Sequence, residues 1–183
     1  DCDDNNSTIS PNVSEVCGDS IDNNCNSLQN ELNATNCTTY YRDSDGDGFG
    51  DSSLSECWCE PGGSDGDFVV TNTSDCYDGN PQVHPYQTAY FSSHRGDGQY
   101  DYNCDGSEEK QNTTNGSCDG WASNIGDCTL NTAGWDGSIP NCGSSGPYLV
   151  DNDSCSGGCE VFGVPFCCEE GGPSYTNSVQ SCR

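Results

Sequence analysis

Residues 43–51 read DSDGDGFGD, an acidic segment with a distinctive spacing. In a calcium-binding loop of the EF-hand type, oxygen ligands stand at positions 1, 3, 5, 7 and 9, and a glycine at position 6 makes the sharp turn. Three alternating aspartates followed by Gly48 fit this pattern. The ligands that it predicts are the carboxylates of Asp43, Asp45, Asp47 and Asp51 and the backbone carbonyl of Phe49.

The segment lacks the last ligand of such a loop. Position 12, which is a bidentate glutamate in an EF-hand, is Leu54 here. The ion must therefore complete its shell from elsewhere, and the clusters DCDD at 1–4 and DCYD at 75–78 are the obvious donors. Their predicted ligands are Asp1, Asp4, Asp75 and Asp78, and the alternative is that both clusters are surface turns.

Two other segments follow the same template less closely. DYNCDGSEE at 101–109 predicts a second calcium loop, with the ligands Asp101, Asn103, Asp105, Glu109 and the carbonyl of Ser107. The third segment begins at Asp22, where asparagine replaces the acid at position 5 and Ser27 replaces the glycine. An Asx-rich turn is as good an interpretation of that segment as an ion site.

The acidic segments belong to a two-copy repeat. DCDDNNSTISP at 1–11 recurs as DCYDGNPQVHP at 75–85, and IDNNCNS at 21–27 is echoed by YDYNCDGS at 100–107. The polar stretch QNTTNGS after Lys110 reads as a linker. The predicted organisation is a two-copy calcium-binding repeat module over 1–110 and a cysteine-rich β/loop module over 111–183.

Composition predicts the fold class. Leu, Ile, Val and Phe account for 23 of 183 residues, too few for a large core, but 16 cysteines supply covalent staples instead. We expect a small disulfide-rich, loop-dominated, calcium-stabilised fold with little helix. Short strands are predicted at 68–71, 147–150 and 160–169, and a short helix at 28–34.

The cysteines also indicate the compartment. Sixteen of them are typical of secreted chains, so the spacings Cys57-Trp58-Cys59 and Cys155 to Cys159 are read as halves of disulfides in preference to zinc ligands. A formal net charge of −26, from 30 acids and four bases, disfavours nucleic acid and anionic lipid as partners. No apolar run is long enough to span a membrane, and no catalytic motif stands out. The chain is therefore predicted to be secreted and non-enzymatic.

The quoted repeat segments, together with YYRDSDGDGFGD, resemble the MopE-like metal-binding repeat of secreted proteins, and the acidic loops are similar to thrombospondin type 3 calcium repeats. The resemblance covers residues 1 to about 110. It implies an extracellular, calcium-dependent, multi-repeat chain without established catalysis. The segment at 22–30 departs from the acidic DNDCDG pattern of the family. Residues 111–183 resemble tails found after such repeats, with no activity attached.

Acceptor sequons for N-glycans are frequent. Nine occur, against roughly four expected from composition, although Asn and Ser are also common turn residues. Leaving aside the overlapping pair at Asn5 and Asn6, the predicted acceptors are Asn12, Asn33, Asn36, Asn72, Asn112, Asn115 and Asn152.

These features predict a structural protein that binds Ca²⁺, carries N-glycans and assembles with copies of itself into an extracellular filament or surface layer. Repeat-built chains present matching end faces, which favours head-to-tail contacts. The first terminal residue lies within a repeat and the last follows Cys182, so a neighbouring copy is one way to hold both ends. The alternatives are a carbohydrate-binding or adhesion module and, third, an extracellular hydrolase.

Overall fold

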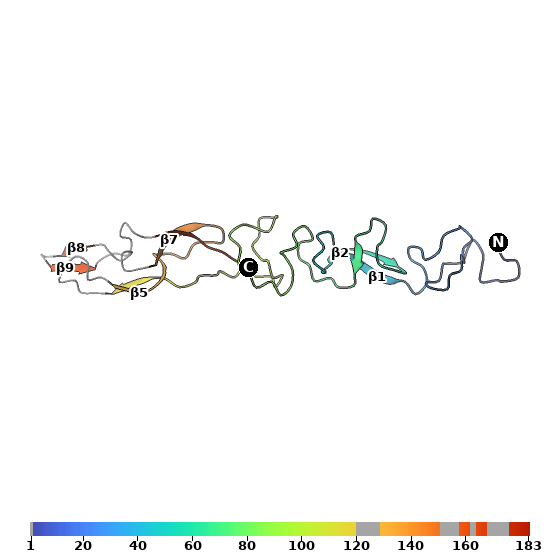
Figure 1. Ribbon diagram of the computed structural model, residues 1–183, viewed down its shortest axis with the longest axis horizontal. Coiled ribbons are helices and arrows are strands. Elements are labelled where there is room, and N and C mark those ends of the chain that lie inside the picture. Colours follow the sequence, from blue (N-terminus) through green and yellow to red (C-terminus); the bar gives the residue numbers. More distant parts are fainter. Residues whose placement is uncertain (1, 120–128, 151–157, 162–163, 168–175) are drawn as a thin grey trace. The chain divides into compact units, whose positions relative to one another are not determined.

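The computed structural model describes residues 2–119, 129–150, 158–161, 164–167 and 176–183 (Figure 1). The chain divides into two compact units, Asp1–Gln87 and Thr88–Arg183. Within the described ranges the regular structure consists of short antiparallel strands in small sheets, and there is no helix. A bilayer-spanning helix is accordingly not found among these residues. The predicted disulfide-rich, loop-dominated fold class is confirmed.

The first unit contains one three-stranded sheet. It has the order β2-β1-β3, and its strands are β1 (Thr38–Arg42), β2 (Asp51–Trp58) and β3 (Phe68–Val70). The pairing of β1 with β2 runs from Thr38 opposite Trp58 to Arg42 opposite Asp51, with an irregularity before Arg42. The acidic segment is therefore the connection of the β1–β2 hairpin, which fixes both of its ends. The predicted strand at 68–71 is confirmed as β3.

The second unit contains three small sheets. One has the order β10-β7-β6, and the other two pair β4 with β5 and β8 with β9. Their strands are β4 (Ser117–Asp119), β5 (Thr129–Thr132), β6 (Gly134–Trp135), β7 (Ser145–Leu149), β8 (Gly158–Val161), β9 (Val164–Cys167) and β10 (Thr176–Val179). Strand β7 confirms the prediction at 147–150. Strands β8 and β9 cover the described part of 160–169, while 162–163 and 168–169 lie outside the described residues.

The helix predicted at 28–34 is wrong. Asn30 and Asn33 both have a left-handed backbone, with φ of 56° and 61°. Upstream, the backbone N–H of Leu28 donates to the side chain of Asn26 at 2.8 Å. Asparagine favours such local bonds and tolerates left-handed geometry, and both properties compete with helix formation.

Disulfides take over much of the role of a core in the first unit. Its buried apolar side chains are few: Ile9, Ala34, Phe68 and Val83. Three bridges join Cys2 to Cys25, Cys17 to Cys59 and Cys37 to Cys57. Each bridge in a small domain is worth about 2–4 kcal/mol. Cys57 and Cys59 are therefore halves of two different disulfides, as predicted.

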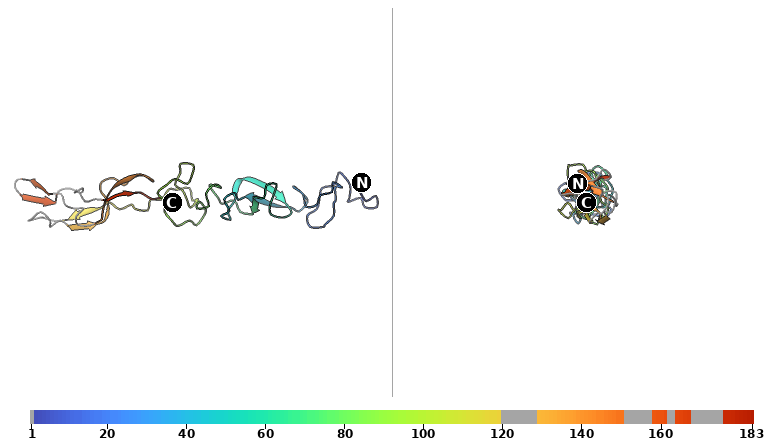
Figure 2. Two further views of the ribbon diagram at one scale, coloured as in Figure 1. Left: turned by 45° about the horizontal axis from the view of Figure 1, so that its top comes forward. Right: turned by 90° about the vertical axis from the view of Figure 1, so that its left-hand side faces the viewer.

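The end of the chain is tied into the second unit. Cys142 is bridged to Cys182, whose backbone pairs with Phe91 and Lys110. The C-terminus accordingly lies beside the green segment that follows residue 88 in both Figure 1 and Figure 2. This pairing explains why residues 88–110 belong to the same compact unit as the end of the chain. The module boundary predicted near residue 111 rests on sequence repeats and stays a prediction.

Candidate metal centre

The acidic loop is wound around Asp43. This side chain is buried, with 9% of its surface exposed, and its Oδ1 accepts the backbone N–H groups of Gly46 and Asp47 at 2.8 and 3.2 Å. Its Oδ2 accepts the N–H of Gly48 at 3.1 Å. Gly48 has a φ of 90°, a conformation that suits glycine and gives the turn expected at position 6.

Asp45 and Asp47 each have one carboxylate oxygen that accepts no hydrogen bond from the protein. Asp45 Oδ1 accepts the N–H of Asp47 at 3.2 Å, and Asp47 Oδ1 accepts the N–H of Phe49 at 2.8 Å. The Oδ2 atom of each is buried with no hydrogen-bond partner in the protein. A buried oxygen left in this way is costly unless something else contacts it.

Asp75 reaches the loop from the second copy of the repeat. A parallel bridge pairs it with Asp51, and its N–H donates to the carbonyl of Gly50 at 3.3 Å. Its side chain is 8% exposed. Oδ1 accepts the N–H of Tyr77 at 2.8 Å, whereas Oδ2 is buried without a protein partner.

Asp78 completes a group of five carboxylates. The backbone N–H and the hydroxyl of Ser44 donate to its two oxygens at 2.6 and 2.7 Å. Two sets of three carboxylates result, and within each set the ligand oxygens all lie within 4.8 Å of one another. The sets are Asp43, Asp45 and Asp47, and Asp45, Asp75 and Asp78, so Asp45 belongs to both.

The electrostatics of the group favour a cation. Burial, and then repulsion from Asp47 and Asp45, raises the pKa of Asp75 to about 6. Burial and the neighbouring Asp47 raise the pKa of Asp45. Residues 1–87 contain 17 acids and a single Lys or Arg, Arg42, whose guanidinium lies 3.4 Å from Asp67. A divalent cation would satisfy the free oxygens and offset the repulsion.

Two predicted ligands of the loop behave differently. Asp51, at position 9, is held by Ser53, whose N–H and hydroxyl donate to it at 2.7 and 2.9 Å, so it is not in either set. It lines a neighbouring pocket of about 330 Å³ together with Asp75 and Asp78. The ring of Phe49 stacks on His84 with centroids 5.7 Å apart. Ligation by the Phe49 carbonyl stays a prediction.

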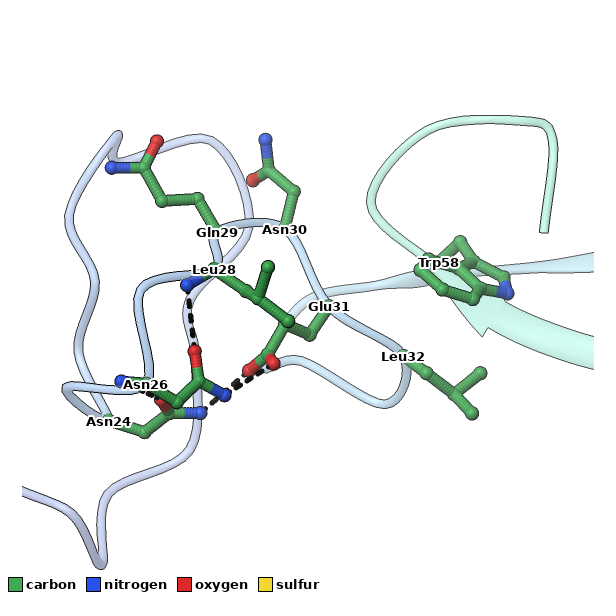
Figure 3. Close-up of a pocket in the computed structure, with 8 residues that line it drawn as sticks. All are labelled: Asn24, Asn26, Leu28, Gln29, Asn30, Glu31, Leu32 and Trp58. Carbon is green, nitrogen blue, oxygen red and sulfur yellow. Dashed lines mark hydrogen bonds between the residues drawn. The ribbon is translucent and has the colours of Figure 1, made fainter. Parts of the chain in front are cut away.

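The segment that begins at Asp22 is closed by protein groups. Asp22 accepts the N–H groups of Asn26 and Ser27 at 3.1 and 2.7 Å. The side-chain amides of Asn24 and Asn26 both point to Glu31 and donate to it at 2.6 Å (Figure 3). The calcium-loop template assigns no role to Glu31. No spacing rule marks it as their acceptor, because these bonds depend on how the segment turns back on itself.

The segment at 101–109 is wound like the acidic loop but gathers fewer carboxylates. Asp101 accepts the N–H of Gly106 at 3.0 Å, and Asn103 donates to Asp105 at 3.1 Å. Glu109 lies 3.7 Å from the guanidinium of Arg183. In the part of the chain that the structure describes, no set of three close carboxylates comes from this segment. Ser107 ligation stays a prediction.

The DCDD cluster is joined to the segment at 22–30 by the disulfide between Cys2 and Cys25. Asp4 is exposed, and the described carboxylates of this cluster belong to neither close set. Asp1 lies outside the described residues. The copy of this cluster at 75–78 therefore contributes to the group, and the described part of the first copy does not.

The raised pKa of Asp75 predicts how the metal-free protein responds to pH. In the unfolded chain this group titrates near 3.8, and in the folded chain near 6. Between these values the folded state holds a proton that the unfolded state has lost, so this group stabilises the fold below pH 4, and the contribution is lost as pH rises to about 6. Thermal unfolding of the metal-stripped protein should show this loss, and Asp75→Asn should remove it. Parallel pH profiles for the two proteins would contradict the assignment.

Two segments, residues 1–31 and 75–89, match a protein-family model, Cu-binding_MopE, described as "Putative metal-binding motif". Comparisons with curated proteins and with solved structures give no match. The matched segments contain the two copies of the DCDD/DCYD repeat, and the second includes Asp75 and Asp78. The chain therefore contains two segments that match this motif model, and its internal repeat relates them to each other.

Proposed function

We propose that this chain is a secreted structural protein whose fold is held by Ca²⁺ at the β1–β2 loop. The buried Asp75 Oδ2, which has no protein partner and lies with Asp45 and Asp78, carries the proposal. Together with Asp43 and Asp47, these side chains would hold the ion. The ion would supply positive charge and coordinate oxygens, and so tie the hairpin loop to the segment at 75–78.

The ligand chemistry favours calcium over the copper of the family name. Carboxylate and carbonyl oxygens suit Ca²⁺, whereas copper favours imidazole and sulfur ligands. Residues 1–87 contain one histidine, His84, whose ring stacks on Phe49 and whose Nδ1 lies 2.8 Å from the Pro85 carbonyl. The chain has no methionine, and no described cysteine is free. Oxygen is thus the ligand type that the site offers in quantity.

A structural role follows from how the ion would act. An ion that binds only the folded state stabilises it by mass action, by about 2.7 kcal/mol at a free concentration of 100 Kd. Extracellular calcium modules commonly bind with Kd near 10⁻⁴–10⁻³ M. The disulfides place the chain in an oxidising compartment, which agrees with such a setting. We accordingly propose that the chain is secreted and acts without catalysis.

Calorimetric titration of the metal-stripped chain with Ca²⁺ and, separately, with Cu²⁺ tests the site. Asp45→Asn and Asp75→Asn should each weaken Ca²⁺ binding about tenfold or more, because each removes a charged ligand. Asp65→Asn is the matched control, because Asp65 is exposed and its bond to the N–H of Asp67 suits an amide oxygen equally. Binding of copper but not calcium, or equal affinities in all variants, would refute the proposal.

We also propose that copies of the chain associate into a filament or surface layer. The repeat organisation supports this, as do exposed apolar side chains in the first unit, including Leu28 and Tyr86 at 60% and 86% exposure. Light scattering of the native material with Ca²⁺ should give particles many times the mass of one chain. Chelator should then lower that mass. A single-chain mass under both conditions would exclude self-assembly.

Carbohydrate binding is a second candidate, supported by the pocket in Figure 3. Its volume is about 510 Å³, and Trp58 of β2 lies across it from Asn24 and Asn26. An aromatic face opposite amides and a carboxylate is the kind of surface that binds a sugar ring. Titration with neutral oligosaccharides should then show binding that Trp58→Ala removes and Trp135→Phe, a change in the other unit, leaves intact. Binding unaffected by Trp58→Ala would exclude this pocket.

A further inference from the structure

Asn72 holds the far end of the acidic loop at two points. Its side-chain Nδ2 donates to the carbonyl of Gly48 at 2.8 Å, and its Oδ1 accepts the N–H of Gly50 at 3.2 Å. These two glycines flank Phe49, whose carbonyl occupies position 7 of the predicted loop. Asn72 itself lies more than 20 residues along the chain, just after β3.

The contact is also close in the backbone. A Cβ atom added to Gly50 would lie 2.7 Å from the carbonyl oxygen of Asn72 and 2.7 Å from side-chain carbons of Tyr41 and Val70. The segment around Asn72 therefore packs directly against the loop.

Asn72 is at the same time the acceptor of the sequon Asn72-Thr73-Ser74. We propose that Asn72 is a positioning residue for the metal loop, and that a glycan on this residue and cation binding by the loop exclude each other. This inference rests on the proposed calcium site. The side chain of Asn72 is bonded to the loop, whereas the acceptors Asn12 and Asn33 are exposed.

The chemistry of the amide explains the exclusion. In N-glycosylation, Nδ2 gives up one proton to a base and forms a bond to the anomeric carbon of a lipid-pyrophosphate-linked oligosaccharide. The bond from that carbon to the phosphate oxygen breaks, and the lipid pyrophosphate leaves with the electron pair. The product is a secondary amide, whose preferred trans form places the sugar carbon on the same side as the carbonyl oxygen. The Gly48 carbonyl and the Gly50 N–H are only two residues apart. Asn72 therefore bonds both of them through one edge of its amide, the edge formed by Oδ1 and the Nδ2 hydrogen beside it. The sugar would take the place of the hydrogen that Gly48 accepts.

The loop also depends on both bonds for its ends to stay in place. Without the amide, the Gly48 carbonyl and the Gly50 N–H lose their partner at the point where the loop joins β2. Two lost hydrogen bonds of ordinary net strength correspond to a fall in affinity of about tenfold or more.

The test uses the full chain, made once in an oxidising host compartment without N-glycosylation and once in a glycosylating secretory host. Asn72→Ala removes both the clamp and the acceptor, whereas Ser74→Ala removes the acceptor alone. In the sugar-free protein, Ca²⁺ should bind wild type and Ser74→Ala equally and Asn72→Ala about tenfold more weakly. Should Asn72→Ala fail to form its disulfides, Asn72→Asp, which keeps the acceptor for Gly50 but lacks the donor, takes its place.

A second readout concerns the glycan itself. In the glycosylated protein, peptide mass mapping should find Asn72 less occupied than Asn12 and Asn33, and molecules that carry a sugar at Asn72 should bind Ca²⁺ more weakly. Full occupancy at Asn72 with undiminished affinity would overturn the inference, as would equal affinities of Asn72→Ala and Ser74→Ala. If sugar-free wild type binds no Ca²⁺ at all, the proposed function fails as well.

Discussion

Repulsion among five aspartates is the constraint on which the first unit depends. Asp43, Asp45, Asp47, Asp75 and Asp78 lie at one end of a small sheet, in a unit whose only Lys or Arg pairs with Asp67. Few buried apolar side chains are available to offset that repulsion. Covalent bridges hold the surrounding chain, and the loop itself gathers oxygens that the protein leaves unbonded. A cation bound here would offset the repulsion and tie the loop to the segment at 75–78.

The internal repeat is used asymmetrically. The DCYD copy at 75–78 contributes two carboxylates to the β1–β2 loop, whereas the described part of the DCDD copy contributes none to either close set. The difference follows from what each copy is joined to: Asp75 bridges to Asp51 beside the loop, whereas Cys2 is bonded to Cys25. Two similar sequences thus have different roles because different partners lie next to them.

Much of the fold and of the acidic loop could be predicted from the chemistry of neighbouring residues in the sequence. The features that could not be predicted depend on side-chain bonds that compete with regular structure or on contacts between separated residues. Alternating aspartates with Gly48 identified the loop, β-branched residues identified β3, and the Cys57–Cys59 spacing identified two half-disulfides. The helix predicted at 28–34 failed because asparagine side chains satisfy the backbone in another way. The roles of Glu31 and Asn72 depend on partners several to more than 20 residues away, which spacing rules do not reveal.

The disulfide between Cys37 and Cys57 encloses the whole acidic loop within a covalent ring. One residue of the pair precedes β1 and the other lies near the end of β2, so every peptide bond of the loop lies between them. Hydrolysis of any one of these bonds would leave the two new ends attached to one molecule. A cut in the loop would then be invisible to size measurements under non-reducing conditions and would appear as two fragments once the cystines are reduced.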